Sequence, residues 1–365
     1  WNDLVFTLDD KVTSTVYDTF EKFWKKGLIY RGKKLVNFCT KHQTAFADIE
    51  VTHKEEKGKL WSIAYPLANP TDELKEVVVA TTRPDTMLGD TAVAVNPEDP
   101  RYKKFIGKEL ILPLTDRKIK LIADEHADME YGTGAVKITP AHDQNDYEVG
   151  ERHNLDMITV IGFDGKMNEN AGKYEGMTTA ECRKAVLDDL EKLGLRRGEE
   201  NITHEVGHCY KCDTVIEPLL KEQWFVDMKP LAKKAIETLK AGKIKFHPAN
   251  KQKVLINYLE NLKDWNISRQ IPWGIPIPAF QNINDPTDWI FDTRVNEPEI
   301  VSEGKTYRRD PDTFDTWFSS SQWPYITTSD MPHHYPTSVM ETGADLLFQW
   351  VGRMIMLGLY ITDDI

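Results

Sequence analysis

Long apolar runs are missing from this chain of 365 residues. A membrane-spanning helix needs about 18 or more consecutive apolar residues, and no stretch approaches that length. The N-terminus also lacks the basic and then apolar segments of a secretory signal. We therefore expect a cytoplasmic protein with no membrane partner. The start at Trp1 without a methionine, and the end just after the apolar run Leu357 to Ile361, lead us to expect a piece of a longer protein.

An excess of basic residues is missing as well. Lys and Arg number 46 against 58 Asp and Glu, so the net charge is −12. This charge disfavours a nucleic-acid partner at first sight. Local basic patches remain open, around Arg31 to Lys34 and Lys243 to Lys253, although each can equally be an ordinary solvated face. The composition is that of a soluble globular protein, and the length predicts two or three domains.

Cysteine is scarce, but its spacing is informative. Cys39 is followed by His42, Cys209 is followed by Cys212, and these two pairs lie 209 − 42 = 167 residues apart. Pairs of this spacing supply two ligands each to a tetrahedral zinc ion. Without a secretory signal we expect reduced thiols rather than disulfides. The sequence therefore predicts a structural zinc site made of Cys39, His42, Cys209 and Cys212. Small buried apolar cysteines are the alternative.

Hydrophobic periodicity predicts a helix from about Thr7 to Gly27, with further helices at 143–153, 178–193, 231–239 and 251–262. Short β-type runs dominate the segment between the cysteine pairs, at 61–67, 77–82, 91–95, 110–114, 119–123, 135–139 and 157–161. If both pairs bind one metal, residues near 40 and 210 are neighbours. We predict a β-rich, barrel-like α+β domain at 51–205, inserted into a second domain formed by 1–50 and 206–365.

The most informative segment is Gly132 to Tyr147. A glycine turn leads into a short apolar strand that carries Lys137, and Pro140 ends the strand. Asp143 and Asp146 follow at the start of a helix, so a cation and two carboxylates converge at the strand end. Such a site suits a ligand that has an ammonium and a hydroxyl group beside a carbonyl.

Several motifs in order resemble class I aminoacyl-tRNA synthetases of the valine, isoleucine and leucine group. These motifs are Ala80 to Thr86, Gly132 to Asp146, the second cysteine pair with Pro218, and Gln223 to Phe225. The valine-specific branch is the most similar, through Leu88 to Pro97, Asp315 to Ser320 and Tyr335 to Val339. In the isoleucine enzymes a histidine is usual in place of Lys137. The resemblance covers essentially the whole chain.

The resemblance implies that 51–205 is an editing domain that hydrolyses threonyl-tRNA(Val). Asp146 is expected to bind the substrate ammonium. Asp143 is expected to bind the threonine hydroxyl or to orient the loop, and Lys137 to stabilise the developing oxyanion or to bind a substrate oxygen. The same family match nominates residues that bind the amino acid or the terminal adenosine: Thr81, Thr82, Arg83, Tyr131, Thr139 and His142. In the remainder, a partial Rossmann-type catalytic domain with the zinc site at its junction, Trp317 resembles a residue of the amino-acid pocket. We expect a monomer that binds tRNA(Val).

The HIGH and KMSKS signatures of the family are absent from the sequence. The full-length enzyme would ligate valine to tRNA(Val) with ATP and Mg²⁺, and we do not expect this chain to do so alone.

Other interpretations stay open at this stage. Asp143 can be only a helix N-cap, His142 only a structural hydrogen-bonding residue, and Arg83 to Asp85 only a turn. The chain can belong to an isoleucine or leucine enzyme, or be a non-catalytic, zinc-stabilised tRNA-binding module. A metal phosphohydrolase that uses His142 and Asp143 is a further alternative, although such enzymes are all-helical and need more histidines nearby.

Overall fold

The computed structural model describes residues 4–329, 331 and 333–363, so Trp1 lies outside the described residues. The chain divides into two compact units. One unit consists of residues 33–221, and the other of residues 1–32 and 222–365. Both unit boundaries fall inside strands, because β1 spans Ile29–Cys39 and β10 spans Glu217–Val226. The predicted limits of the inserted domain, 51 and 205, remain a prediction.

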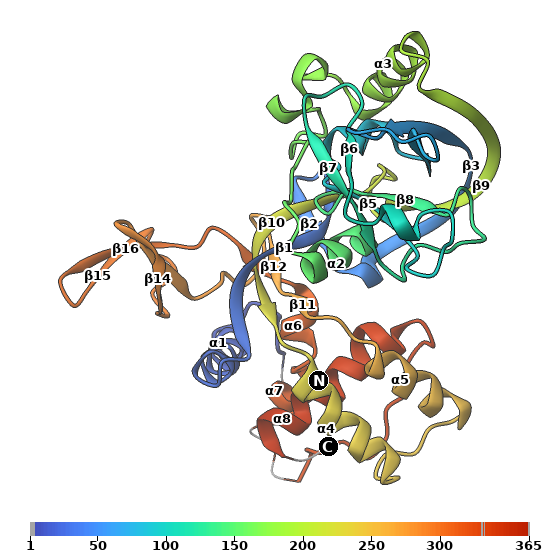
Figure 1. Cartoon of the computed structure of the whole chain (residues 1–365). Coiled ribbons are helices and arrows are strands. Elements are labelled where there is room, and N and C mark those ends of the chain that lie inside the picture. Colours follow the sequence, from blue (N-terminus) through green and yellow to red (C-terminus); the bar gives the residue numbers. More distant parts are fainter. Residues whose placement is uncertain (1–3, 330, 332, 364–365) are drawn as a thin grey trace. The chain divides into compact units, whose positions relative to one another are not determined.

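The unit of residues 33–221 is rich in strands and has two α-helices, α2 and α3, among its described residues (Figure 1). Besides β1 and β10, its elements are β2 Thr44–Phe46, η1 Asp48–Glu50, β3 Val51–Pro66, β4 Glu76–Thr81, η2 Pro84–Gly89, β5 Ala92–Val95, η3 Lys103–Phe105, β6 Glu109–Ile111, β7 Lys118–Ala123, β8 Ala135–Ile138, α2 Gln144–His153, η4 Glu169–Tyr174, α3 Thr179–Lys192 and β9 Arg196–Cys209.

The strands of this unit form separate sheets. One sheet has the order β4-β3-β9, and another has the order β6-β7-β5-β8. Strands β5 and β7 are parallel, whereas β8 and β6 pair antiparallel with their neighbours. The predicted barrel is therefore wrong: within the described residues no closed barrel forms. An isolated bridge between Leu67 and Leu110 links the two sheets, and a single bridge does not close a barrel.

Most predicted elements are confirmed to within a few residues, because they bury one apolar face. The run 157–161 is an exception, since it forms only an isolated bridge from Ile161 to Met167. The sequence also gave no signal for the paired polar halves of β3 and β9, which Figure 1 shows as a long curved ribbon. Residues 52–57 are exposed on both faces, so the alternation that reveals a strand is missing there.

A small apolar core fixes the part of this unit that matters most below. Ala92 and Ala94 of β5, Ile138 of β8 and Val149 of α2 are fully buried against one another. A second cluster, Leu35, Ala141, Tyr147 and Leu220, ties the loop between β8 and α2 to β1 and β10. These contacts hold the end of β8 beside the start of α2.

The unit of residues 1–32 and 222–365 contains most of the helices. Its elements are α1 Asp10–Lys25, α4 Lys229–Lys240, α5 Asn250–Glu260, β11 Trp265–Asn266, β12 Ser268–Arg269, β13 Ala279–Asn282, β14 Asp285–Phe291, β15 Glu299–Ser302, β16 Lys305–Arg309, β17 Thr313–Phe314, α6 Thr316–Ser320, α7 Trp323–Thr328, η5 Leu347–Val351 and α8 Gly352–Thr362.

Strands β12 to β17 pair antiparallel, in a sheet of order β14-β13-β16-β15 and in the pair β12-β17. These strands therefore do not form the parallel sheet of a Rossmann-type domain. The largest core cluster of this unit combines aliphatic and aromatic side chains, and helix α1 contributes its buried face, with Val12, Val16, Phe20 and Phe23 fully covered. Gly27, with φ 69°, follows the end of α1, as predicted.

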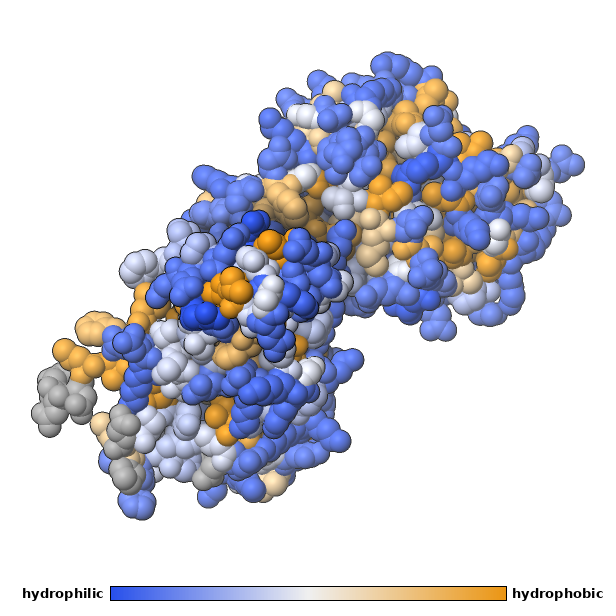
Figure 2. Space-filling view, turned by 90° about the vertical axis from the view of Figure 1, so that its left-hand side faces the viewer, coloured by the Kyte–Doolittle hydropathy of each residue, from blue (hydrophilic) through white to orange (hydrophobic). Residues whose placement is uncertain are grey.

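Among the described residues, no helix is both long and apolar enough to cross a membrane. On the face drawn in Figure 2, hydrophilic residues predominate and hydrophobic residues form separate small groups.

We predict that Phe20→Ala destabilises the helical unit by about 3–5 kcal/mol. Phe20 is fully buried, and its ring contacts those of Trp24, Trp224 and Phe314 at centroid distances of 5.5, 5.9 and 5.4 Å. Urea unfolding followed by tryptophan fluorescence measures the change. Val301→Ala, at a residue 66% exposed, is the control and should cost less than about 0.5 kcal/mol. A loss below about 1 kcal/mol for Phe20→Ala would contradict this packing.

Candidate functional site

The polar residues predicted from the Gly132 to Tyr147 segment converge where β8 ends and α2 begins. Lys137 lies on β8, and Thr139 follows that strand directly. Asp146 lies in the first turn of α2. All three side chains are buried. The structure therefore brings a cation, a hydroxyl and a carboxylate into one enclosed region of the unit.

Lys137 donates its ammonium hydrogens to protein oxygens. Its Nζ lies 3.2 Å from Thr86 Oγ1 and 3.5 Å from Asp90 Oδ1, and it also hydrogen-bonds Thr139 Oγ1. Asp90 is fully buried and accepts further hydrogen bonds from Thr139 Oγ1, at 2.6 Å, and from Tyr65 OH, at 2.7 Å. Burial raises the pKa of Asp90, while the ammonium and the hydroxyl donors oppose that rise.

Asp146 is a buried carboxylate with few donors. It is 6% exposed, and Thr139 N–H donates to its Oδ2 at 2.9 Å. Within the described part of the chain, no side chain donates a hydrogen bond to it. Burial, together with the neighbouring charge of Asp143, raises the pKa of Asp146 to about 7, although Lys137 acts in the opposite direction. A carboxylate of this kind is short of partners and suits a cationic ligand.

Asp143 is the N-cap of α2, as one of the sequence interpretations held. Its Oδ1 accepts hydrogen bonds from Asn145 N–H at 2.8 Å and from Asp146 N–H at 3.1 Å. The residue is exposed. Capping occupies Oδ1 and places the carboxylate beside that of Asp146.

His142 bridges two backbone groups. Its Nε2 accepts a hydrogen bond from Val160 N–H at 2.8 Å, and its Nδ1 lies 3.3 Å from Pro218 O. Nδ1 is therefore the protonated nitrogen of a neutral imidazole. Burial is the main cause that lowers the pKa of His142 to about 3, and the positive charge of Arg83 is the second. With both ring nitrogens engaged, His142 offers no ligand to a metal, which argues against the metal phosphohydrolase.

Thr81 and Arg83 belong to the first of the matched motifs, Ala80 to Thr86, at the end of β4. The Thr81 hydroxyl accepts from Arg83 N–H at 3.0 Å, and Thr82 follows, half-buried. The Arg83 guanidinium binds Asp85 Oδ2 at 2.7 Å and Glu217 Oε2 at 3.0 Å. Arg83 is thus held in an ion-pair cluster, and a contact between it and the terminal adenosine stays a prediction.

That cluster is buried and balanced. Asp85 is fully buried and also accepts from Arg183 Nε of α3 at 2.9 Å. Burial alone would raise the pKa of Asp85, but the two guanidiniums outweigh it and lower the value. Glu217, at the first position of β10, shows the reverse balance, since burial raises its pKa. Two arginines and two carboxylates therefore fix β4, η2, α3 and β10 to one another.

Two predicted residues lie apart from this cluster. Tyr131 is 69% exposed, in the turn closed by a hydrogen bond from Gly134 N–H to Tyr131 O. Its ring is free to pack against a ligand. Trp317 belongs to the other unit, where α6 places it against the core, and its backbone N–H donates to Asp315 Oδ1 at 3.0 Å.

The four predicted metal ligands converge. Cys39, His42, Cys209 and Cys212 present one ligand atom each, and all four atoms lie within 4.8 Å of one another. Both pairs use the same turn: Gln43 N–H donates to Cys39 O and Asp213 N–H to Cys209 O, at 2.8 and 2.9 Å, and both turns end on a left-handed residue. Three thiols and one imidazole at tetrahedral spacing fit a metal ion of the zinc type.

The remaining cysteine, Cys182, lies buried on α3 and takes no part in this group. Burial acts to raise the pKa of the Cys212 thiol, but hydrogen bonding with Thr214 and the neighbouring thiols lowers it to about 7. Burial raises the pKa of Cys39 to about 11.

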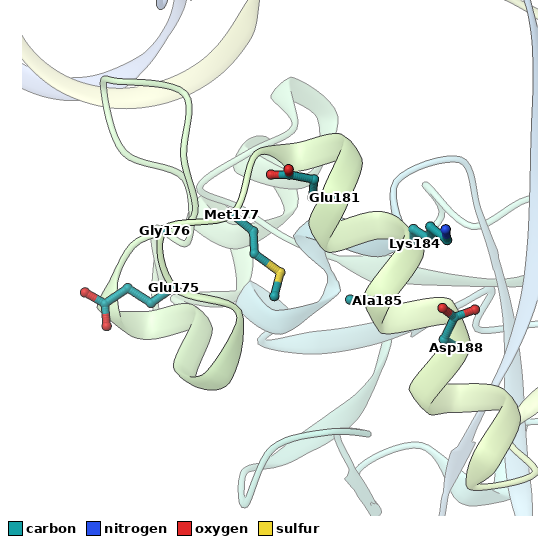
Figure 3. A pocket seen from close by; sticks show the side chains of 7 residues that line it. All are labelled: Glu175, Gly176, Met177, Glu181, Lys184, Ala185 and Asp188. Atoms are coloured by element: carbon teal, nitrogen blue, oxygen red, sulfur yellow. The ribbon is translucent and has the colours of Figure 1, made fainter.

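A surface hollow of about 600 Å³ lies elsewhere on this unit, between α3 and the loop before it (Figure 3). Glu175, Met177 and Glu181 line one end and Lys184 and Asp188 the other. It shares no residue with the predicted site.

Sequence reasoning missed several members of the site. Asp90, Tyr65 and Thr86 contact the Lys137 cluster, and Glu217 completes the Arg83 cluster. Asp90 stands inside the Leu88 to Pro97 motif, directly before a strand of small apolar residues, and a lone acid there was the available signal. Nothing local distinguishes Tyr65 or Glu217.

Comparison with known proteins identifies the family. The family profile described as "tRNA synthetases class I (I, L, M and V)" matches residues 1–365. The chain is 49% identical to the "Valine--tRNA ligase" of Carboxydothermus hydrogenoformans over 100% of its length, 49% identical to that of Petrotoga mobilis over 98%, and 48% identical to that of Thermotoga maritima over 100%. It spans 42%, 41% and 42% of these relatives, respectively. The chain therefore belongs to the class I tRNA synthetases of the isoleucine, leucine, methionine and valine group.

Proposed function

We propose that the unit of residues 33–221 is the editing site of a valine-specific synthetase and hydrolyses threonyl-tRNA(Val). The observation that carries the proposal is Asp146, a buried carboxylate to which no described side chain donates, beside the Lys137 and Thr139 cluster. The relatives named above are valine–tRNA ligases, which supports valine over isoleucine or leucine specificity.

A valine enzyme has a physical reason to need such a site. An apolar pocket rejects an isostere that adds only a hydroxyl by about 10²-fold, and valine enzymes facing threonine are the established example of this limit. A polar second site can instead require the hydroxyl. A valyl side chain has no hydroxyl for the Asp143 carboxylate, so it would lose a hydrogen bond to a charged group, worth about 1.5–3 kcal/mol.

The chemistry is ester hydrolysis. Water adds to the ester carbonyl, the bond between the carbonyl carbon and the ribose oxygen breaks, and the ribose oxygen takes up a proton. Asp146 holds the substrate ammonium, and Asp143 is the nearer group for the threonine hydroxyl. The N–H groups of Lys137 are held by Thr86, Thr139 and Asp90, so Lys137 acts on the developing oxyanion through its positive charge rather than as a hydrogen-bond donor. Tyr131 packs against the substrate from the exposed turn.

The rest of the proposal concerns the complete protein. We infer that residues 1–50 and 206–365 belong to the catalytic domain that, in the full-length enzyme, ligates valine to tRNA(Val) with ATP and Mg²⁺. The metal group is a structural zinc site, since its donors are three thiols and an imidazole. Its ligands hold the ends of β1 and β9 together, and β10 begins five residues after Cys212 (217 − 212).

Deacylation tests the editing proposal directly. With the chain in excess over tRNA, we expect threonyl-tRNA(Val) to lose its ester while valyl-tRNA(Val) stays intact. Asp146→Ala should slow the reaction about 10²-fold or more, because it removes the partner of a buried cation. Asp72→Ala, an exposed aspartate of the same unit, is the matched control. Equal stability of both esters would exclude editing, and tRNA binding without hydrolysis would favour the non-catalytic module.

The raised pKa of Asp146 predicts a stability change of unusual sign. An unfolded aspartate has a pKa of about 3.9. Between about pH 4 and 7 the unfolded chain therefore ionises this residue while the folded chain keeps it protonated, so the free energy of unfolding falls as the pH rises. Asp146→Asn removes this penalty. We expect the variant to be more stable than the parent by about 1–3 kcal/mol at pH 8, and nearly equal to it at pH 4. Urea unfolding at both values measures the difference; destabilisation at pH 8 would contradict the assignment.

Metal analysis tests the zinc site. Protein prepared without chelator should contain about one equivalent of zinc, and Cys212→Ser should lose most of it, because one of four ligands is gone. Cys182→Ser is the matched control, since Cys182 is buried outside the group, and it should retain the metal. Equal zinc contents in the two variants would remove the four-ligand assignment.

A further inference from the structure

Asp90 stands at the centre of the polar cluster without belonging to the predicted site. It follows η2, whose last turn closes with a hydrogen bond from Asp90 N–H to Met87 O. The guanidinium of Arg117 donates to the backbone oxygens of Asp90 and Leu88. The backbone of Asp90 is therefore fixed on both sides, and its fully buried side chain points into the cluster.

Both carboxylate oxygens of Asp90 are engaged. Tyr65 OH donates to Oδ2 at 2.7 Å, whereas Thr139 Oγ1 donates to Oδ1 at 2.6 Å and Lys137 Nζ lies 3.5 Å from that same oxygen. These three donors come from β3, the loop after β8 and β8 itself. Asp90 thus connects the sheet that contains β3 to the sheet that contains β8 through its side chain.

The ammonium of Lys137 has three N–H groups and three protein acceptors, namely Thr86, Thr139 and Asp90. Asp90 is the one carboxylate among them. Lys137 is therefore satisfied by the cluster around Asp90. Asp146, on the other side of Thr139, receives the backbone N–H of that residue instead of the ammonium.

We propose that Asp90 is a positioning residue of the editing site: it holds Lys137 and Thr139 and takes up the lysine charge, which leaves Asp146 to the substrate ammonium. The inference rests on the proposed function. Asp90, which lies outside the predicted site, binds the protein's own cation, Lys137. Asp146 stays available for the cation of the ligand.

The charges that face Asp146 agree with this division. Asp143 from its own N-cap and Asp90 from the end of η2 favour the protonated form, and Lys137 from β8 favours the ionised form. Arg83 is held by Asp85 and Glu217, Arg117 donates to backbone oxygens, Tyr65 donates to Asp90, and His142 is neutral between two backbone groups. Lys137 already favours the ionised form of Asp146, and without the charge of Asp90 it would have no carboxylate among the described residues at hydrogen-bond distance to offset its own charge.

The pH dependence of threonyl-tRNA(Val) hydrolysis by Asp90→Asn tests the inference. In the parent chain we expect kcat/KM to rise with pH through about 7, as Asp146 ionises. In Asp90→Asn the midpoint should fall by about one pH unit, because Lys137 then stabilises the ionised form. KM should rise about tenfold at pH 8, since the lysine competes with the substrate ammonium. A purely structural role would lower the rate at every pH and leave the midpoint in place.

The chain offers a matched control. Asp288 on β14 also accepts hydrogen bonds from a lysine and a tyrosine, Lys305 at 2.9 Å and Tyr307 at 3.0 Å, but in the other unit. Asp288→Asn should leave both the midpoint and KM unchanged. Tyr65→Phe keeps the shape of the cluster and weakens the ionised form of Asp90, so it should shift the midpoint in the same direction by a smaller amount.

NMR titration of ¹³C-labelled aspartate carboxyl groups reads the pKa of Asp146 without tRNA and serves if a variant is too slow to assay. A midpoint for Asp146 that is unchanged in Asp90→Asn, or in Tyr65→Phe if the first variant does not fold, would overturn the role of Asp90. A parent chain that leaves threonyl-tRNA(Val) intact would instead overturn the proposed function, whatever the titration shows.

Discussion

Near the junction of β8 and α2, two carboxylates, Asp90 and Asp146, are buried with one ammonium, that of Lys137, and the candidate site depends on this imbalance of charge. Lys137 contacts Asp90, whereas Asp146 accepts a hydrogen bond from a backbone N–H. An uncompensated buried carboxylate is costly, and it persists only where the surrounding packing prevents it from reaching water. The fully buried Ala92, Ala94, Ile138 and Val149 provide that packing. The rigidity of this small core is therefore what allows a reactive carboxylate to exist here.

The strand after the second cysteine pair links the metal group to this site. Within β10, Glu217 binds Arg83 and the carbonyl of Pro218 faces His142. The same imidazole accepts the N–H of Val160. His142, a substrate-binding candidate on sequence grounds, thus fastens the loop between β8 and α2 to two other segments. Both contacts start from β10, which begins shortly after the second cysteine pair. This strand therefore lies between the four metal ligands and the Arg83 cluster in the sequence and contacts the latter directly.

Much of this arrangement was predictable because its signals are local. The spacing within the two cysteine pairs predicted the metal ligands, and the position of Asp143 before a helical pattern predicted that it caps α2. The barrel was wrong because short apolar runs predict strands but not which strands pair, and pairing was decided by long-range packing. Asp90, Tyr65 and Glu217 escaped for the same reason. Each is a single polar residue whose partners lie tens of residues or more away, and no local pattern encodes that distance.

Residues whose hydrogen bonds are satisfied within the protein and the under-partnered Asp146 have opposite effects on stability. Asp143, as the helix cap, and the Arg83 cluster have their hydrogen-bond partners within the protein, so they contribute to stability whether or not a ligand is present. Asp146 does the opposite, since its raised pKa shows that the folded chain resists its charge. A residue that lowers stability and is nevertheless held in place by fully paired neighbours is best explained by a ligand that supplies the missing cation. The ammonium of the aminoacyl ester proposed above carries that charge.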